Sequence, residues 1–189
     1  FRLEFQPQAS TETGRLCGFE ALLRWMHPEH GELSAAQFMS LAETTSQIVP
    51  VGAWVLEQAL AQVAQWRREG HAHLRVAVNL SPFQLRDPEL AGHIAAALKK
   101  HRINPKLLPC EITESVAMED AVETMKVFDT LAQVGVHISI DDFGTGYSSL
   151  SYLQRLPLFE LKIDRSFVQD TPHDINDTAI VQSILSMAH

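Results

Sequence analysis

The sequence predicts an α/β fold, a TIM-like (β/α) barrel of which about six strands are present. Strand and helix signals alternate along the chain, which is typical of parallel strands joined by helical crossovers. The 189 residues, 46% of them hydrophobic, are enough for one globular domain with a substantial core. No glycine-rich nucleotide loop follows the first strand signal, which disfavours a dinucleotide-binding open sheet.

Six segments show the apolar pattern of strands and are bounded by turn or helix signals. The predicted strands are residues 1–9, 16–25, 74–81, 107–115, 136–143 and 159–164. A TETG turn separates the first two, whereas long helical segments separate the later ones. The sheet should therefore be mostly parallel.

Apolar residues at helical spacing, together with capping signals, predict the helices. Ser34 and Gln37 have the spacing of a capping box, and Gly70 and Gly135 are expected to end two helices. The expected helical segments are residues 34–46, 51–68, 81–84, 87–101, 119–134, 144–156 and 176–189. Ser81, Asp87 and either Asn176 or Asp177 are the expected caps of three of them.

Charge and cysteine content exclude several classes of function. The formal net charge of −8 disfavours binding to duplex nucleic acid, which needs a basic face. Cys17 and Cys110 form neither a disulfide framework nor a zinc pattern, so we expect both to be reduced. No apolar run could span a bilayer and no signal peptide opens the chain. We expect a cytoplasmic domain, whose parent protein could be membrane-anchored through another segment.

Five polar side chains occupy matching positions within or near the ends of five successive predicted strands. They are Glu20, Asn79, Glu111, Asp141 and Lys162. A barrel of parallel strands would bring all five to one mouth, where the acids would repel one another without a cation. Hard oxygen ligands beside one amine predict a magnesium or manganese site that acts on a phosphate.

The alternative is a wet barrel interior in which these polar groups only satisfy one another as salt bridges. For any single residue, this explanation is as good as a functional one. For the whole set it fails, because the acids outnumber the available bases, Lys162 and Arg24. Burying unneutralised carboxylates is costly, and one or two metal ions would balance the charge.

The segment DDFGTGYSSL, residues 141–150, is the second informative pattern. Asp141 and Asp142 would point to opposite faces of a strand, unless the strand ends between them and the loop turns Asp142 back. Gly144 and Gly146 permit such a tight loop and let backbone N–H groups approach an anion. The alternative is a plain glycine turn between a strand and a helix.

Together these motifs resemble the EAL domain family of bacterial cyclic di-GMP phosphodiesterases. The name-giving tripeptide is Glu20-Ala21-Leu22, within FEALLRW. The other motifs are QPQ at 6–8, NLS at 79–81, EITES at 111–115, DDFGTGYSSL at 141–150 and KID at 162–164. The resemblance covers the whole chain, and the combination is specific although the tripeptide alone is not.

The resemblance implies a role for each matching polar residue of the expected metal site. The implied ligands of a first metal ion are Glu20, Asn79, Glu111 and Asp141, and Asp142 is the implied ligand of a second. Lys162 would hold and orient the attacking water. The implied catalytic residues are therefore Lys162, Glu20, Asp141 and Asp142.

The resemblance also implies substrate-binding and loop-anchoring residues. Arg24 would contact a substrate phosphate, and Leu22, Gln6 and Gln84 are further candidates for the substrate pocket. Glu114, expected on the opposite strand face from Glu111, would anchor the glycine loop at Gly144 and Gly146.

By resemblance, the domain would hydrolyse cyclic di-GMP to linear pGpG. Two Mg²⁺ or Mn²⁺ ions would support the reaction, whereas Ca²⁺ would be inhibitory because it is larger and less strict in geometry. A homodimer and an upstream sensor or GGDEF domain are the implied partners, with no duplex nucleic acid. The residues alone leave open another metal-assisted hydrolase on a barrel. The alternative within the family is a non-catalytic EAL domain that serves as a cyclic di-GMP receptor or a dimerisation module.

The chain departs from the family pattern at its ends. The family barrel has eight strands, so residues 1–189 are expected to form one EAL domain that lacks the N-terminal helix and the last strands. An AEGVE-like strand, whose glutamate is a metal ligand or general base, belongs to the part not seen. We expect further sequence after His189, or exchange with an adjacent chain, to complete the barrel.

Overall fold

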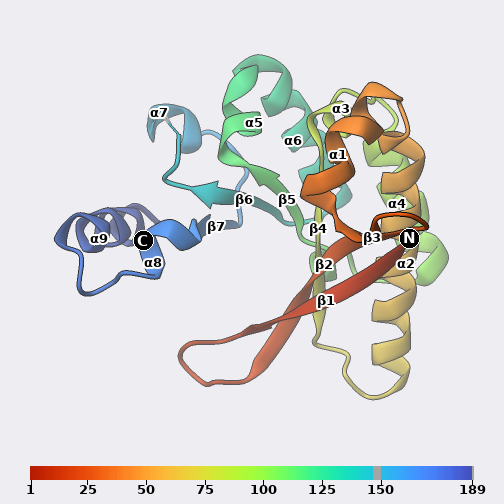
Figure 1. Ribbon diagram of the computed structural model, residues 1–189, viewed down its shortest axis with the longest axis horizontal. Helices are drawn as coiled ribbons and strands as arrows, with labels where there is room; N and C mark the ends of the chain where they lie inside the picture. The colour runs from red at the N-terminus through yellow and green to blue at the C-terminus, as the bar shows by residue number, and fades with distance from the viewer. Residues whose placement is uncertain (147–149, 189) are drawn as a thin grey trace.

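A curved sheet of seven strands forms the centre of the computed structural model, which describes residues 1–146 and 150–188 (Figure 1). The strands are β1 (Arg2–Ala9), β2 (Leu16–His27), β3 (Gly31–Ser34), β4 (Arg75–Asn79), β5 (Cys110–Thr113), β6 (Ile138–Phe143) and β7 (Glu160–Ile163). The helices are α1 (Ala35–Thr44), α2 (Ile48–Arg68), α3 (Pro82–Leu85), α4 (Leu90–His101), the 3-10 turn η1 (Pro105–Leu107), α5 (Glu114–Glu119), α6 (Ala121–Val134), α7 (Leu150–Leu153), α8 (Arg165–Val168) and α9 (Ile175–Ala188).

The strand order confirms the predicted α/β class with mostly parallel strands. Along the sheet the order is β1-β2-β4-β5-β6-β7, and β3 pairs with the far part of β2. The β1–β2 and β2–β3 pairs are antiparallel, while each step from β2 to β7 is parallel. All six predicted strands are present. The short strand β3 was missed because Gly31 and Pro28 gave this segment the signals of a loop.

The sheet curls around a polar interior. Lys162 on β7 and Glu20 on β2 are separated in the sheet order by β4, β5 and β6, yet their charged atoms are 3.1 Å apart. In a flat sheet, four strand spacings would put these backbones about 19 Å apart, beyond the reach of the two side chains. The parallel strands must therefore curve toward each other, as in the wall of a barrel.

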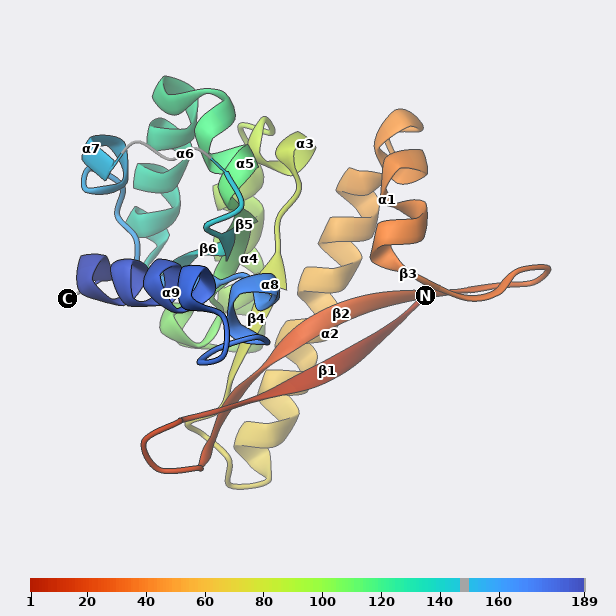
Figure 2. The same cartoon turned by 60° about the vertical axis from the view of Figure 1, so that its left-hand side comes forward.

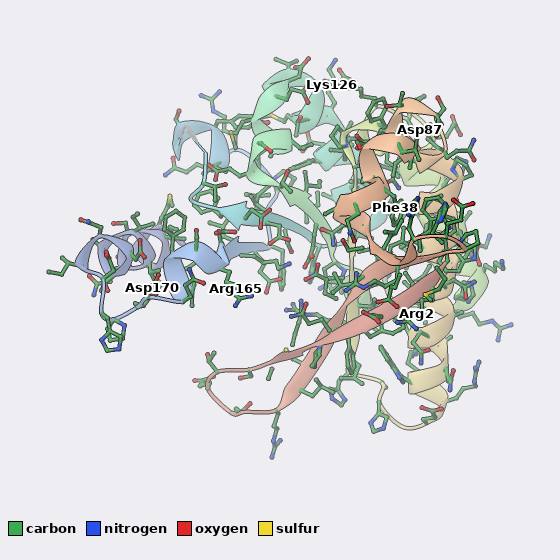
Figure 3. All side chains as sticks on the ribbon, in the orientation of Figure 1. Arg2, Phe38, Asp87, Lys126, Arg165 and Asp170 are labelled. Atoms are coloured by element: carbon green, nitrogen blue, oxygen red, sulfur yellow. The ribbon has the colours of Figure 1, made fainter. Side chains whose placement is uncertain are left out.

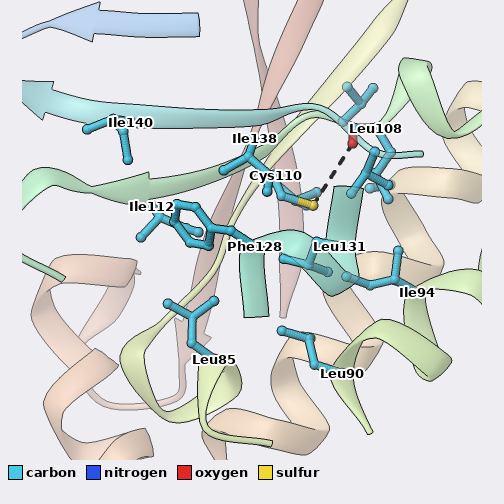
Figure 4. Close-up of a cluster of buried hydrophobic side chains, with 14 of the residues drawn as sticks. Leu85, Leu90, Ile94, Leu108, Cys110, Ile112, Phe128, Leu131, Ile138 and Ile140 are labelled. Carbon is cyan, nitrogen blue, oxygen red and sulfur yellow. Dashed lines mark hydrogen bonds between the residues drawn. The ribbon is translucent and has the colours of Figure 1, made fainter. Parts of the chain in front are cut away.

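Helices cover the outer face of the sheet. Helix α2 packs against α4, and α4 packs against α6, so that the three lie in sequence order (Figure 2). Apolar side chains of the strands alternate with the polar interior set and meet these helices. Phe128 and Leu131 of α6 are fully buried against Ile112 and Ile138 of the sheet (Figure 4).

A second, smaller apolar cluster fixes the first helices. Phe38 of α1, labelled in Figure 3, is buried and its ring lies 5.5 Å from that of Trp25 on β2. Phe1 contacts the rings of Trp25, Phe38 and Trp54. Together with Leu23 and Ile48, these residues attach α1 and the start of α2 to the distal half of β2.

Helix ends follow their capping residues, with two corrections. Asp87 was expected as a cap, but α4 begins at Leu90 with Glu89 as its N-cap, and the Asp87 carboxylate accepts a hydrogen bond from Glu89 N at 2.9 Å. Gly135 ends α6 in the left-handed region at φ 94°, as predicted. The expected cap of the last helix, Asn176 or Asp177, is wrong. The carboxylate of Asp174 instead accepts hydrogen bonds from the backbone N–H groups of both residues. An acceptor two or three residues upstream satisfies these otherwise unpaired donors.

The structure also bears on the state of the two cysteines and on the presence of membrane-spanning helices. Cys17 and Cys110 are free thiols, and Cys110 is buried in the sheet. Within residues 1–146 and 150–188, no helix combines the length and the apolar character needed to cross a membrane.

Candidate active site

Lys162 lies at the centre of a group of carboxylates. Its ammonium Nζ donates hydrogen bonds to Glu111 Oε2 at 2.8 Å, Asp141 Oδ2 at 3.0 Å and Glu20 Oε2 at 3.1 Å. The Asn79 amide Nδ2 donates to the other Glu20 oxygen, Oε1, at 2.9 Å. All five residues that the sequence placed at one mouth therefore meet in space.

The register of the strands explains this convergence. Asn79, the last residue of β4, pairs with Glu111 on β5, and Thr113 on β5 pairs with Asp141 on β6. Because side chains alternate across a strand, each of these polar residues faces the interior while its apolar neighbours face the helices. Parallel strands bring their carboxyl ends to the same rim, and the site forms there.

Burial and the close approach of charges shift the pKa values of Glu111 and Lys162. Glu111 is only 1% exposed, and burial raises the pKa of its carboxyl group to about 7, against the opposing effect of Lys162. Burial alone would lower the pKa of Lys162, but the negative charges of Glu111, Asp141 and Glu20 raise it above its ordinary value. Lys162 is therefore an ammonium ion at neutral pH, and it partly neutralises the carboxylates.

The residues present fit a divalent cation. Glu20, Glu111 and Asp141 each offer a carboxylate oxygen, and these oxygens lie within 4.8 Å of one another. Glu111 Oε1 is buried without a hydrogen-bond partner among the described residues, so one acceptor remains for a ligand. When ionised, the three carboxylates and Lys162 leave two uncompensated negative charges. This charge and this donor set are those that Mg²⁺ and Mn²⁺ prefer.

The backbone at Asp141 and Asp142 differs from the predicted strand end between these two residues. β6 does not end between the two residues but continues to Phe143, and the register with β7 is irregular between Ile140 and Phe143. Asp142 itself adopts a left-handed conformation, φ 53°, which redirects its side chain within the strand. The Asp142 carboxyl lies beside Asp164, and its pKa is raised by burial and by the neighbouring acids. The grouped carboxylates of Glu20, Glu111 and Asp141 do not include it.

Glu114 anchors the glycine loop, although its position was predicted wrongly. It is not on the opposite strand face from Glu111, because β5 ends at Thr113 and Glu114 begins α5. Its buried Oε2 accepts hydrogen bonds from Gly144 N at 2.9 Å and Gly146 N at 3.1 Å. Gly144 has φ 105°, a conformation that favours glycine. Residues 147–149 of the same motif lie outside the described residues.

The expected substrate-binding residues occupy two different settings. Arg24 and Leu22 share the strand face of Glu20, and Gln6 pairs with Glu20 across the β1–β2 ladder, so these three lie on the same face of the sheet as the carboxylates. The Arg24 guanidinium forms an ion pair with Glu4, with Nε and Oε2 2.9 Å apart.

Gln84, in contrast, is enclosed by the protein. It is 8% exposed, its Oε1 accepts a hydrogen bond from Ser81 N at 3.1 Å, and its side chain abuts Gly52 of α2. These contacts give Gln84 a capping and packing role, and its contact with substrate stays a prediction.

Sequence reasoning missed a charged partner beneath the carboxylates. Arg75 Nη2 pairs with Glu160 Oε1 at 3.0 Å, and Ser139 Oγ donates to Glu160 Oε2 at 3.3 Å. The available signal was positional, since Ser139 and Glu160 precede Asp141 and Lys162 by one same-face step. Arg75 carried no such signal, because it lies four residues before Asn79 in a strand that reads as apolar.

Comparison with known proteins decides the family. The model of the EAL domain matches residues 1–189, the whole chain. The chain belongs to the EAL domain family. The solved structure of PaMucR phosphodiesterase in complex with c-di-GMP superposes with a TM-score of 0.93 at 47% sequence identity, covering 98% of this EAL domain and 75% of that chain.

Two curated relatives come from Pseudomonas aeruginosa. The bifunctional diguanylate cyclase/cyclic di-GMP phosphodiesterase MucR is 48% identical over 185 residues, which are 98% of this chain and 27% of MucR. The cyclic di-GMP phosphodiesterase NbdA is 40% identical over 186 residues, which are 98% of this chain and 24% of NbdA. The EAL domain described here thus spans about a quarter of the length of these relatives.

Proposed function

We propose that this EAL domain is a metal-dependent phosphodiesterase that hydrolyses one phosphodiester bond of cyclic di-GMP and releases linear pGpG. The observation that carries the proposal is the convergence of three carboxylates from β2, β5 and β6 around Lys162, where Glu111 Oε1 has no hydrogen-bond partner among the described residues. The names of MucR and NbdA supply the substrate, which the carboxylates by themselves would not identify.

The proposal assigns metal binding to the carboxylates and Asn79. Glu20, Asn79, Glu111 and Asp141 would hold a first Mg²⁺ or Mn²⁺ ion, and Asp142 would contribute to a second. When bound, the ions polarise the phosphoryl oxygens and lower the pKa of water. We expect Ca²⁺ to bind and to inhibit, because it accepts irregular geometry.

The remaining roles follow from charge and position. Because the pKa of Lys162 is raised, its ammonium group would orient the attacking water by donating hydrogen bonds and would not take its proton. Arg24 would exchange its ion pair with Glu4 for a substrate phosphate, as guanidinium groups favour phosphate oxygens. Leu22 and Gln6 would line the same pocket beside Glu20. A homodimer and an attached sensor or GGDEF domain are proposed partners; the bifunctional name of MucR supports the latter.

The test is to incubate the protein with cyclic di-GMP and separate the guanine nucleotides by chromatography. We expect pGpG to form with Mg²⁺ or Mn²⁺, and no product with EDTA or Ca²⁺. Glu111→Ala should abolish product formation in every condition. Tight binding of cyclic di-GMP without product in Mg²⁺ and Mn²⁺ would contradict the enzyme and support a receptor.

A further inference from the structure

A second layer of polar side chains lies inside the curved sheet, beneath the carboxylate group. Glu160 on β7 accepts contacts from two strands: Arg75 of β4, at 3.0 Å, and Ser139 of β6, at 3.3 Å. The side chains of Arg75 and Glu160 are 22% and 32% exposed, so solvent screens this pair less than an ion pair at the surface. Among the described residues, the contacts of this pair do not include Glu20, Glu111 or Asp141.

The two layers share the same strands. Ser139 precedes Asp141 by two residues on β6, and Glu160 precedes Lys162 by two residues on β7. One same-face step along a strand is about 6.6 Å. Ser139 and Glu160 therefore lie one same-face step before Asp141 and Lys162, and can support these two site residues without touching a candidate metal ligand.

Gly18 makes room for the deeper pair. It is aligned with Arg75 in the β2–β4 ladder and lies two residues before Glu20. A Cβ atom at Gly18 would lie 2.4 Å from Arg75 Cγ, closer than real Cβ contacts allow. The absence of a side chain on β2 thus lets the Arg75 side chain lie across this strand.

A contact between β7 and a strand other than β6 would restrain the position of β7. In the described sheet β7 pairs with β6 alone, and that ladder is irregular between Ile140 and Phe143. Its hydrogen bonds do not by themselves fix how far Lys162 stands from Glu20 on β2. The Arg75–Glu160 pair joins β7 to β4 across β5 and β6, and so restrains the same distance one layer deeper.

We propose that Arg75 and Glu160 are a pair of positioning residues, which holds Lys162 and Asp141 at the depth where metal and substrate bind. The inference rests on the proposed phosphodiesterase function for its catalytic consequence, but not for its effect on metal binding. Lys162 contacts the candidate ligands directly, whereas the contacts of the deeper pair among the described residues involve none of them. The pair can therefore restrain the position of Lys162 without competing for a metal ligand.

The test is a double-mutant cycle with Arg75→Met, Glu160→Gln and the combined variant. Each single change should weaken Mn²⁺ binding and lower kcat by about 10–100-fold, as for other residues that orient metal ligands through a neighbour. The combined variant should lose no more Mn²⁺ affinity and no more kcat than the more impaired single variant, because the two residues act through one contact. Arg75→Lys should recover part of the loss. Ser139→Ala, which removes one contact to Glu160, supplies a milder variant if Arg75→Met does not fold.

The matched control is the exposed pair Arg86–Glu119, which has a similar 3.1 Å contact with both side chains about 60% exposed. Arg86→Met and Glu119→Gln should leave Mn²⁺ binding and kcat unchanged. The proposal is overturned if Glu160→Gln keeps both within about twofold of the parent, or if the losses in the combined variant multiply as for independent sites. If the parent protein does not cleave cyclic di-GMP, the proposed phosphodiesterase function is contradicted. The Mn²⁺ affinities of the variants then still test whether Arg75 and Glu160 position the site.

Discussion

Lys162 concentrates the chemistry of the site in one side chain. It forms ion pairs with Glu20, Glu111 and Asp141, which come from three different strands. The other basic residue expected to help, Arg24, is paired with Glu4 instead. The ion pairs neutralise part of the acid charge, and we propose that Lys162 has a second, separable role in orienting water when metal is bound.

The substitution Lys162→Ala separates these roles. Turnover of cyclic di-GMP should fall by about 10²–10⁴-fold, the usual cost of losing a positioned catalytic group, while the affinity for cyclic di-GMP is kept. Without metal, the melting temperature should also fall, because three acids lose their cation. Mn²⁺ should reverse most of that fall. Turnover, binding constants and melting curves with and without Mn²⁺ provide the measurements.

A surface lysine provides the control for this variant. Lys126 pairs with Glu123 on the exposed face of α6, and its side chain is 68% exposed. Lys126→Ala should change neither turnover nor the melting temperature appreciably. If Lys162→Ala loses ligand affinity and stability together, and Mn²⁺ restores neither, Lys162 has only a neutralising role.

At the scale of elements, the short helix α5 links the carboxylates to the glycine loop. Glu111 on β5 faces the site, and Glu114, three residues later, holds Gly144 and Gly146 from the start of α5. The change from strand to helix between these two glutamates lets them face different partners. One carboxylate is therefore available to metal, and the other is committed to backbone N–H groups.

This arrangement predicts different defects for the two glutamates. Glu111→Ala should abolish both Mn²⁺ binding and hydrolysis, because it removes a candidate ligand. Glu114→Ala should lower kcat but retain Mn²⁺ affinity, because it leaves two backbone donors unpaired and loosens the loop beside Asp142. Calorimetric titration with Mn²⁺ separates them, and an equal loss of affinity in both variants would contradict the division.

A glutamate of α2 and two basic residues of α4 form contacts whose contribution to stability depends on pH. Glu57 Oε2 lies 2.8 Å from His101 Nε2 and 2.7 Å from Lys100 Nζ. His101 first, and then Lys100, hold the pKa of the Glu57 carboxyl below its ordinary value of 4.5. Because the pKa of Glu57 is lower in the folded state, its contacts with His101 and Lys100 stabilise the fold at pH values above the unfolded-state pKa of Glu57. This contribution is lost as the pH falls through the folded-state pKa.

The variant Glu57→Gln should therefore flatten the loss of stability at acid pH. The Glu57 side chain is 35% exposed, so the effect on unfolding free energy at neutral pH should be below about 1 kcal/mol. Urea unfolding between neutral pH and the acid transition measures it. Glu123→Gln, on the exposed Lys126 pair, is the control, and an unchanged acid limb in Glu57→Gln would refute the assignment.

At the scale of the whole molecule, one apolar core outside the sheet maintains the polar interior. The strands place Ile112, Ile138 and Ile140 against the outer helices, and Phe128 of α6 fills the space between them with no exposed surface (Figure 4). The free energy of this burial offsets the cost of gathering charged groups on the opposite face. Because the parallel strands have one apolar and one polar face, the apolar core and the charged site can form on opposite sides of the same sheet.

Truncating the core should therefore affect the entire domain. Phe128→Ala should lower the free energy of unfolding by about 3–5 kcal/mol, through lost burial and a residual cavity. Val122→Ala, on the same helix but 70% exposed, should have little effect. Chemical denaturation of both variants provides the measurement, and a similar small change in both would show that α6 does not anchor the core.

The sequence by itself determined the α/β class, the six strand segments and the five residues that meet at the site. Periodicity was sufficient for this, because local alternation decides which face of a strand is apolar. Turn signals concealed β3, and the change from strand to helix at Glu114 could not be read from a continuous polar and apolar pattern. Residue types likewise predicted metal-binding chemistry at Glu20, Glu111 and Asp141, while the identity of the substrate required family resemblance.

Only the tertiary structure decided the contacts that depend on sheet curvature and on backbone conformation. It brought Lys162 to Glu20 across three intervening strands, paired Arg75 with Glu160, and left Arg24 with Glu4. It also turned Asp142 through its own left-handed backbone, where glycines had been expected to do so. Such contacts join residues up to 142 positions apart, and no local pattern records the distance between strands once the sheet has curved.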